Sequence, residues 1–144
     1  MNPADRALCT LTADLLRTDG VLARWSLALS CIACLTLALA HARLPTLAWL
    51  ILLATALIAL PERYLALRVR LDALLFARLA GGTLDTPEHI DHAFARLHLR
   101  PAASQPRALA DRAVGARRLM LRHGALVAAQ TLAFLAAMVL ELKH

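Results

Sequence analysis

Aromatic residues and lysine are scarce in this chain of 144 residues. Phe, Trp and Tyr together account for 4% of it, and Lys143 is the only lysine. Leu and Ala instead dominate a composition that is 60% hydrophobic, well above the content of about 45–50% that is typical of soluble domains. Because these two residues favour helices over β-strands, the composition predicts an all-α protein whose apolar excess is not exposed to water.

Charge is missing from three stretches, residues 25–42, 44–61 and 123–140. Each is about 18 residues long, which is just enough for a helix to cross a bilayer. We therefore predict an integral membrane protein with three transmembrane helices and a cytoplasmic amphipathic helical segment. The predicted units are an amino-terminal interfacial segment, a transmembrane hairpin, a basic helical segment, and a third transmembrane helix with a short tail; they cover residues 1–24, 25–61, 62–122 and 123–144.

The distribution of basic residues predicts the orientation of the chain. All but two of the sixteen Lys and Arg residues lie on one side of the predicted spans, the exceptions being Arg43 and Lys143. Cytoplasmic loops carry such an excess, so the amino terminus is expected in the cytoplasm and the carboxyl terminus outside. The near-exclusive use of Arg indicates a GC-rich, bacterial coding sequence. The expected location is the cell inner membrane. A cleaved secretory signal is the alternative for the first span, since residues 38–40 form a small-x-small pattern.

Helical patterns continue outside the three charge-free stretches. Residues 62–80 extend the pattern of the second span, and Gly81-Gly82 are expected to end it. Near the amino terminus, Asn2 is a candidate cap and Gly20 a stop for a helix that lies along the membrane surface. The alternative for this segment is a frayed tail that becomes ordered only against a partner. A further short helix is expected over residues 86–99.

The clearest amphipathic pattern covers residues 107–122 and runs directly into the third span. One face is apolar, and arginines lie on the rest of the helix. We expect these arginines at headgroup depth, where they contact anionic lipids or an acidic partner protein: Arg107, Arg117, Arg118 and Arg122.

Small residues recur every fourth position in two of the predicted spans. Such stripes let helix backbones approach closely in a membrane. The stripe in the first span comprises Ser26, Ser30, Cys34 and Ala38, and that in the third comprises Ala125, Ala129, Ala133 and Ala137. Gln130 is the only side-chain amide in any span, and we expect it to face another helix rather than lipid.

The sequence offers little for catalysis, metal binding or nucleic-acid recognition. Cys31 and Cys34 lie inside a predicted membrane helix, without the strand-to-helix setting of a redox pair. His89 and His92 supply only half of a metal site, because no third ligand follows at a useful spacing. We therefore expect no catalytic, cofactor or metal site, and no nucleic-acid partner since no matching motif is present.

Residues 19–24, Asp-Gly-Val-Leu-Ala-Arg, resemble the opening of the CDP-alcohol phosphotransferase signature, a motif of membrane enzymes. That motif continues with a glycine and two metal-binding aspartates, whereas this chain has Ala33, Leu37 and His41 at those positions. Divalent ions require such carboxylates. The chain therefore lacks the metal site of that family, and we do not expect its activity.

The expected function is that of a non-enzymatic inner-membrane accessory or scaffold subunit. Such a subunit binds a membrane protein partner or itself through its transmembrane faces and basic cytoplasmic helices, and contacts a bilayer with anionic headgroups. Two alternatives stay open. A homo-oligomeric transport or pore component would line its axis with polar span residues, namely Gln130, Ser26, Ser30, Thr36 and Thr55. A lipid-modifying membrane enzyme would gather acids and histidines at the headgroup plane, namely Glu62, His89, Asp91 and His92.

Overall fold

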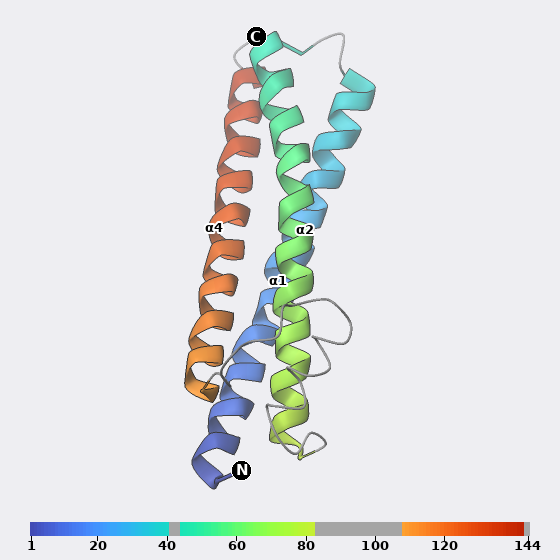
Figure 1. Cartoon of the computed structure of the whole chain (residues 1–144). Helices are drawn as coiled ribbons and strands as arrows, with labels where there is room; N and C mark the ends of the chain where they lie inside the picture. Colours follow the sequence, from blue (N-terminus) through green and yellow to red (C-terminus); the bar gives the residue numbers. More distant parts are fainter. Residues whose placement is uncertain (41–43, 83–107, 143–144) are drawn as a thin grey trace, which may run out of the picture.

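The computed structural model describes residues 1–40, 44–82 and 108–142. It is all-helical, with α1 over Pro3–Ala40, α2 over Thr46–Ala80 and α4 over Leu109–Leu142. In Figure 1, α1 and α4 run in one direction, and α2 runs in the opposite direction and crosses in front of α1. All three helices are long and apolar enough to cross a membrane, which confirms the predicted all-α class and the three predicted span-like helices.

Each helix joins a charge-free stretch to a charged stretch. We call the part of the bundle formed by residues 3–24, 62–80 and 109–122 the charged half, and the remainder of the three helices the apolar half. The helices run without interruption through both halves. The division points expected at residues 24, 61 and 122 are therefore changes of composition within continuous helices.

The helix ends in the charged half follow ordinary capping chemistry. The Asn2 Oδ1 accepts a hydrogen bond of 2.7 Å from the amide of Asp5, which is the expected cap. At the end of α2, the Gly81 amide donates to the Ala77 carbonyl at 3.0 Å, and Gly82 adopts a positive φ of 69°. Glycine is favoured in that left-handed conformation, so the predicted stop at Gly81-Gly82 is confirmed.

The predicted helix stop at Gly20 is wrong, because α1 continues through this residue to Ala40. A glycine inside a helix costs about 1 kcal/mol relative to alanine. Burial of a single large apolar side chain contributes about 1.5–3 kcal/mol, and Leu16 is 2% exposed on the turn before Gly20. Tertiary packing of α1 therefore outweighs the local preference of Gly20.

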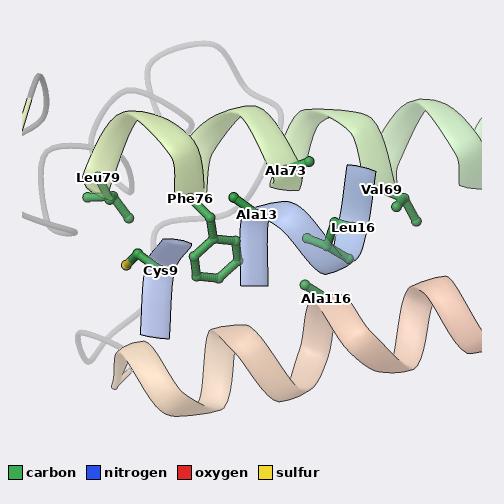
Figure 2. Close-up of a cluster of buried hydrophobic side chains, with 8 residues drawn as sticks. All are labelled: Cys9, Ala13, Leu16, Val69, Ala73, Phe76, Leu79 and Ala116. Atoms are coloured by element: carbon green, nitrogen blue, oxygen red, sulfur yellow. The ribbon is translucent and has the colours of Figure 1, made fainter. Parts of the chain in front are cut away.

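An apolar cluster holds the charged half together. Its buried members come from all three helices: Cys9, Ala13, Leu16, Val69, Ala73, Phe76, Leu79 and Ala116. Figure 2 shows Phe76 projecting from α2 toward α1, where its ring lies beside Cys9 and Ala13. Leu109, Ala113 and Met120 pack against the same cluster, so the face expected for the amphipathic pattern before the third span is directed into the bundle.

The apolar half has a second, smaller core of Ala33, Leu52 and Ala137, one residue from each helix. Two of the three are alanines, which allows the backbones of α1 and α4 to come close to α2. Larger side chains such as Leu37 and Phe134 pack around this contact. Most of the remaining large apolar side chains in this half face outward.

The buried positions follow a seven-residue repeat in every helix. On α2 the fully or nearly fully buried residues include Ala48, Thr55, Glu62, Val69 and Phe76, each seven positions after the last. The corresponding repeats are Thr12, Asp19, Ser26 and Ala33 on α1, and Ala116, His123, Gln130 and Ala137 on α4. A period of 3.5 residues keeps one seam facing its neighbours, as in coiled coils.

The environment of Cys9 leads to a labelling prediction. Burial raises the pKa of the Cys9 thiol, and the nearby Asp5 carboxylate raises it further. In a Cys31→Ser/Cys34→Ser background, Cys9 is expected to react with iodoacetamide at least about tenfold more slowly than a cysteine at exposed position 10, because the thiolate forms less readily and the site must open first. Mass spectrometry of Thr10→Cys/Cys9→Ala gives the reference rate, and equal rates would contradict the buried placement of Cys9.

Candidate functional site

Polar side chains are buried inside the bundle at three levels along its axis. The outer layer is Asp19 with His123, the middle layer is Ser26 with Glu62 and Arg63, and the inner layer is Ser30 with Thr55 and Gln130. Apart from the half-buried Arg63, none of these residues is more than 8% exposed. Along α1 the outer and middle layers are about 10 Å apart, at 1.5 Å per residue.

The outer layer joins α1 to α4 in the charged half. The His123 Nδ1 lies 2.8 Å from the Asp19 Oδ1, and both side chains are buried. Because a carboxylate only accepts hydrogen bonds, Nδ1 is the donor in this pair. The bond places His123, the first residue of the charge-free stretch of α4, at the level of Asp19 on α1. Asp19 precedes the charge-free stretch of α1 by about 9 Å, so the two stretches are offset by that distance along the bundle.

The middle layer joins α1 to α2 where the two halves of the bundle meet. The Ser26 hydroxyl donates to the Glu62 Oε2. The Arg63 Nη2 donates to the Ser26 Oγ at 3.2 Å and to the carbonyl of Ala23 at 2.9 Å. Ser26 therefore bridges a buried carboxylate and a guanidinium.

The inner layer connects all three helices inside the apolar half. The Gln130 Nε2 donates to the Ser30 Oγ at 2.8 Å and to the Thr55 carbonyl at 3.3 Å. The Ser30 hydroxyl in turn donates to the carbonyl of Ser26 at 2.8 Å. Gln130 thus faces α1 and α2 from α4.

Each layer keeps one buried polar atom without a hydrogen-bond partner among the described residues. These atoms are the His123 Nε2, the Glu62 Oε1 and the Gln130 Oε1. Buried polar groups are nearly always paired, with protein or with ordered water. The three layers therefore provide three further hydrogen-bonding positions inside the bundle.

The layers do not assemble a nucleophilic or metal site. Ser26 lies about 10 Å from Asp19 along α1, so the histidine, the aspartate and the serine do not form a catalytic triad. Within residues 1–40, 44–82 and 108–142, no three His, Cys, Asp or Glu side chains gather closely enough to hold a metal ion. His89, Asp91, His92 and the helix expected over residues 86–99 lie outside the described residues.

The polar residues of the pore alternative lie mainly inside a single protomer. Ser26, Ser30, Thr55 and Gln130 are buried and bonded within the bundle. The Thr36 hydroxyl donates to the Ile32 carbonyl of its own helix at 2.9 Å. The structure therefore places four of these five side chains away from the outer surface on which an oligomer axis would form.

The two stripes of small residues lie only partly in the interior. Ser26, Ser30 and Ala137 are buried and Ala133 is half-buried, whereas the other members are exposed: Cys34, Ala38, Ala125 and Ala129. Steps of four residues drift around a helix by about 40° each, while the observed seam follows the 3.5-residue period. Within the described bundle these four residues are not the packing face expected of them, and their contact with another molecule stays a prediction.

The charged half has two groups of arginines, one exposed on α4 and one lining a groove between α1 and α2. Arg117, Arg118 and Arg122 are exposed on α4, and Arg107 lies outside the described residues, so the headgroup contact expected of these four stays a prediction. A groove of about 580 Å³ between α1 and α2 is instead lined by arginines that the sequence had not singled out, together with Asp19 and several apolar residues. They are Arg17, Arg24, Arg63 and Arg70.

Seven-residue spacing is the signal that could have identified the buried layers. Asp19 and Ser26, Thr55 and Glu62, and His123 and Gln130 are all seven positions apart. Residues at this spacing share one face of a supercoiled helix. Small residues at every fourth position drew attention to Ser26 and Ser30, but not to Glu62, the buried partner of Ser26, or to the buried pair of Asp19 and His123.

Comparison of the chain with protein-family models, with curated proteins and with solved structures found no match in any of the three. The fold and the site alone therefore define the class of protein. The chain is an up-down-up bundle of three span-like helices with buried polar layers near the middle of its length.

Proposed function

We propose that the chain is a non-enzymatic protein of the cell inner membrane that serves as an accessory or scaffold subunit. It binds a membrane protein partner or a second copy of itself through its spanning faces and its charged half. Three helices long and apolar enough to cross a membrane support insertion. The concentration of arginine in the charged half supports a cytoplasmic amino terminus and an outer carboxyl terminus, because basic residues accumulate on the cytoplasmic side.

The helices are longer than a bilayer requires. They contain 38, 35 and 34 residues, so each extends over more than about 50 Å at 1.5 Å per residue. The hydrocarbon core of a bilayer is about 30 Å thick. The charged half therefore extends from the membrane as a helical stalk into the cytoplasm.

Exposed apolar side chains on this stalk are the observation that carries the proposal. Leu11 is 70% exposed and Leu15 is 44% exposed on α1, while Leu71 on α2 and Val114 on α4 are also exposed. Leu11 lies about 20 Å from the start of the apolar half, whereas the headgroup region adds only about 5–8 Å on each side of the hydrocarbon core. Lipid does not reach this position, and apolar surface of this kind marks a contact with protein.

Replacing both exposed leucines of α1 is expected to release the partner. Leu11→Gln/Leu15→Gln removes apolar area that contributes about 1.5–3 kcal/mol per leucine when it is fully buried, so binding should weaken at least tenfold. The measurement is the native mass and composition of the tagged full chain, extracted gently from its own membrane.

The matched control is Thr10→Gln/Thr18→Gln, which changes two exposed polar positions on the same helix. The wild type and the control are expected to retain a discrete complex, and the leucine variant to run as a single protomer. A wild type that is already a single protomer, or a leucine variant with an unchanged complex, would overturn the proposal.

A further inference from the structure

The four arginines of the groove between α1 and α2 form two rungs. The contact of Arg63 with the Ala23 carbonyl places Arg63 at the level of Arg24. Because α1 and α2 are antiparallel, seven residues along each helix bring Arg17 and Arg70 to a common level. The upper rung, Arg24 with Arg63, lies where the two halves of the bundle meet, and the lower rung, Arg17 with Arg70, lies about 10 Å farther into the charged half.

The upper rung is held in place by hydrogen bonds to backbone and side-chain oxygens. Arg63 is half-buried and donates to the Ala23 carbonyl and the Ser26 Oγ. The Arg24 Nε donates to the Gly20 carbonyl at 3.2 Å. A guanidinium has five N–H groups in a planar fork, so both side chains keep further donors for a ligand in the groove.

The acidic side chain that lines the groove is already bonded to a residue outside it. Asp19 is the acidic residue among the groove's lining residues, and it is 3% exposed and bonded to His123. Arg17 pairs with Asp14 at 3.1 Å on the exposed surface of α1, which is a weak interaction in water. The groove therefore presents a net positive charge to whatever enters it.

The same groove carries apolar surface that continues into the apolar half. Leu27 belongs to that half and lines the groove, whereas Leu67 lines it on α2 in the charged half, between the levels of the two rungs. Both leucines are about half exposed. Cationic groups at the boundary, with Leu27 beside them on the apolar side, match the two chemical parts of a phospholipid.

We propose that this groove binds one phospholipid with a net negative headgroup. The phosphate lies between Arg24 and Arg63, which can hold its oxygens in bidentate hydrogen bonds, and the first part of an acyl chain covers Leu27. The lower rung of Arg17 and Arg70 attracts the negative charge of the headgroup from the cytoplasmic side. The inference rests on membrane insertion, one part of the proposed function, and is independent of partner binding through Leu11 and Leu15.

The arginines of α4 provide a contrast within the same molecule. Arg117 and Arg118 are exposed neighbours in the charged half, and neither lines the groove. Their attraction to an anionic surface is general and additive. If lipid binds at a defined site between two helices, its affinity depends on which arginines are removed. Two variants with the same net charge then differ in lipid affinity.

The test compares two double variants of the purified full chain in a neutral detergent. Arg24→Gln/Arg70→Gln removes one groove arginine from each helix and spares Arg63, which bonds to Ser26. Arg117→Gln/Arg118→Gln removes the same charge outside the groove. Native mass spectrometry with added dioleoylphosphatidylglycerol, and with dioleoylphosphatidylcholine as the zwitterionic reference, counts the bound lipids and measures their affinity.

The wild type and the α4 variant are expected to bind one phosphatidylglycerol in preference to phosphatidylcholine. The groove variant should bind it roughly thirtyfold more weakly, on the order of fivefold for each arginine near an anionic group. Arg24→Lys/Arg70→Lys should recover part of this loss, because the charge returns without the planar fork. Equal melting temperatures of the variants establish that the fold is retained.

Several results would overturn the inference. Equal weakening in the groove and α4 variants would show a general charge effect, and the absence of any anionic preference in the wild type would show that there is no lipid site. Displacement of the lipid by millimolar inorganic phosphate would assign the groove to a soluble anion instead. Leu11→Gln/Leu15→Gln should leave lipid binding unchanged, so failure of this inference is distinguishable from failure of the proposed function.

Discussion

Replacing His123 with leucine is expected to lower the free energy of unfolding by about 3–5 kcal/mol, the cost of breaking a buried pair by removing one partner. Leucine fills much of the space of the imidazole, but it cannot donate a hydrogen bond to Asp19. That carboxylate is only 3% exposed, and so it would be left buried without its partner. The measurement is reversible unfolding of the full chain in mixed micelles, titrated with sodium dodecyl sulfate.

A double-mutant cycle separates the interaction of the pair from the loss of packing. Asp19→Leu/His123→Leu removes both polar groups, so its loss should be at least about 1–2 kcal/mol smaller than the sum of the two single losses. Arg122→Leu, at the exposed position beside His123, is the matched control and should change stability by no more than about 0.5 kcal/mol. Strictly additive losses would show that the two side chains do not interact in the folded protein.

The helices of this fold could be predicted because they follow from composition and periodicity within continuous segments of the sequence. Three charge-free stretches predicted three span-like helices, and the pattern of residues 62–80 predicted the extension of α2. Gly20 misled the prediction because its preference is local, whereas the burial of Leu16 and Cys9 against two other helices is not visible at that position. The helical cost of Gly20, about 1 kcal/mol, is smaller than the free energy gained by burying these side chains.

The buried layers could not be predicted in the same way. Asp19, Glu62 and His123 each lie at or near the end of an apolar stretch, where an exposed side chain is the ordinary expectation. Their burial depends on the register among three helices, and register follows from contacts between residues that are far apart in the sequence. Gln130 was easier, because an amide inside an apolar stretch has few alternatives to facing another helix.

The middle layer leads to a large expected effect from a small change. Ser26→Ala removes one oxygen but is expected to cost about 3 kcal/mol, because the Glu62 carboxylate loses its hydroxyl donor while it is only 1% exposed. Arg63 loses an acceptor too, although it keeps the Ala23 carbonyl. Ser30→Ala is the comparison on the same helix, since it leaves no charged group unpaired, and it should cost about 1 kcal/mol.

Removing the carboxylate together with the hydroxyl is expected to restore most of that stability. Apolar side chains can replace a buried charged group with little net cost, so Ser26→Ala/Glu62→Met should unfold within about 1 kcal/mol of the wild type. A double variant as unstable as Ser26→Ala would contradict this account of the layer. A return of stability would show that the Glu62 carboxylate contributes little to the free energy of folding. Ser26 has a second contact in this layer, because it accepts a hydrogen bond from Arg63, which lines the groove. The restored variant should therefore fold normally, with Arg63 still bonded to the Ala23 carbonyl.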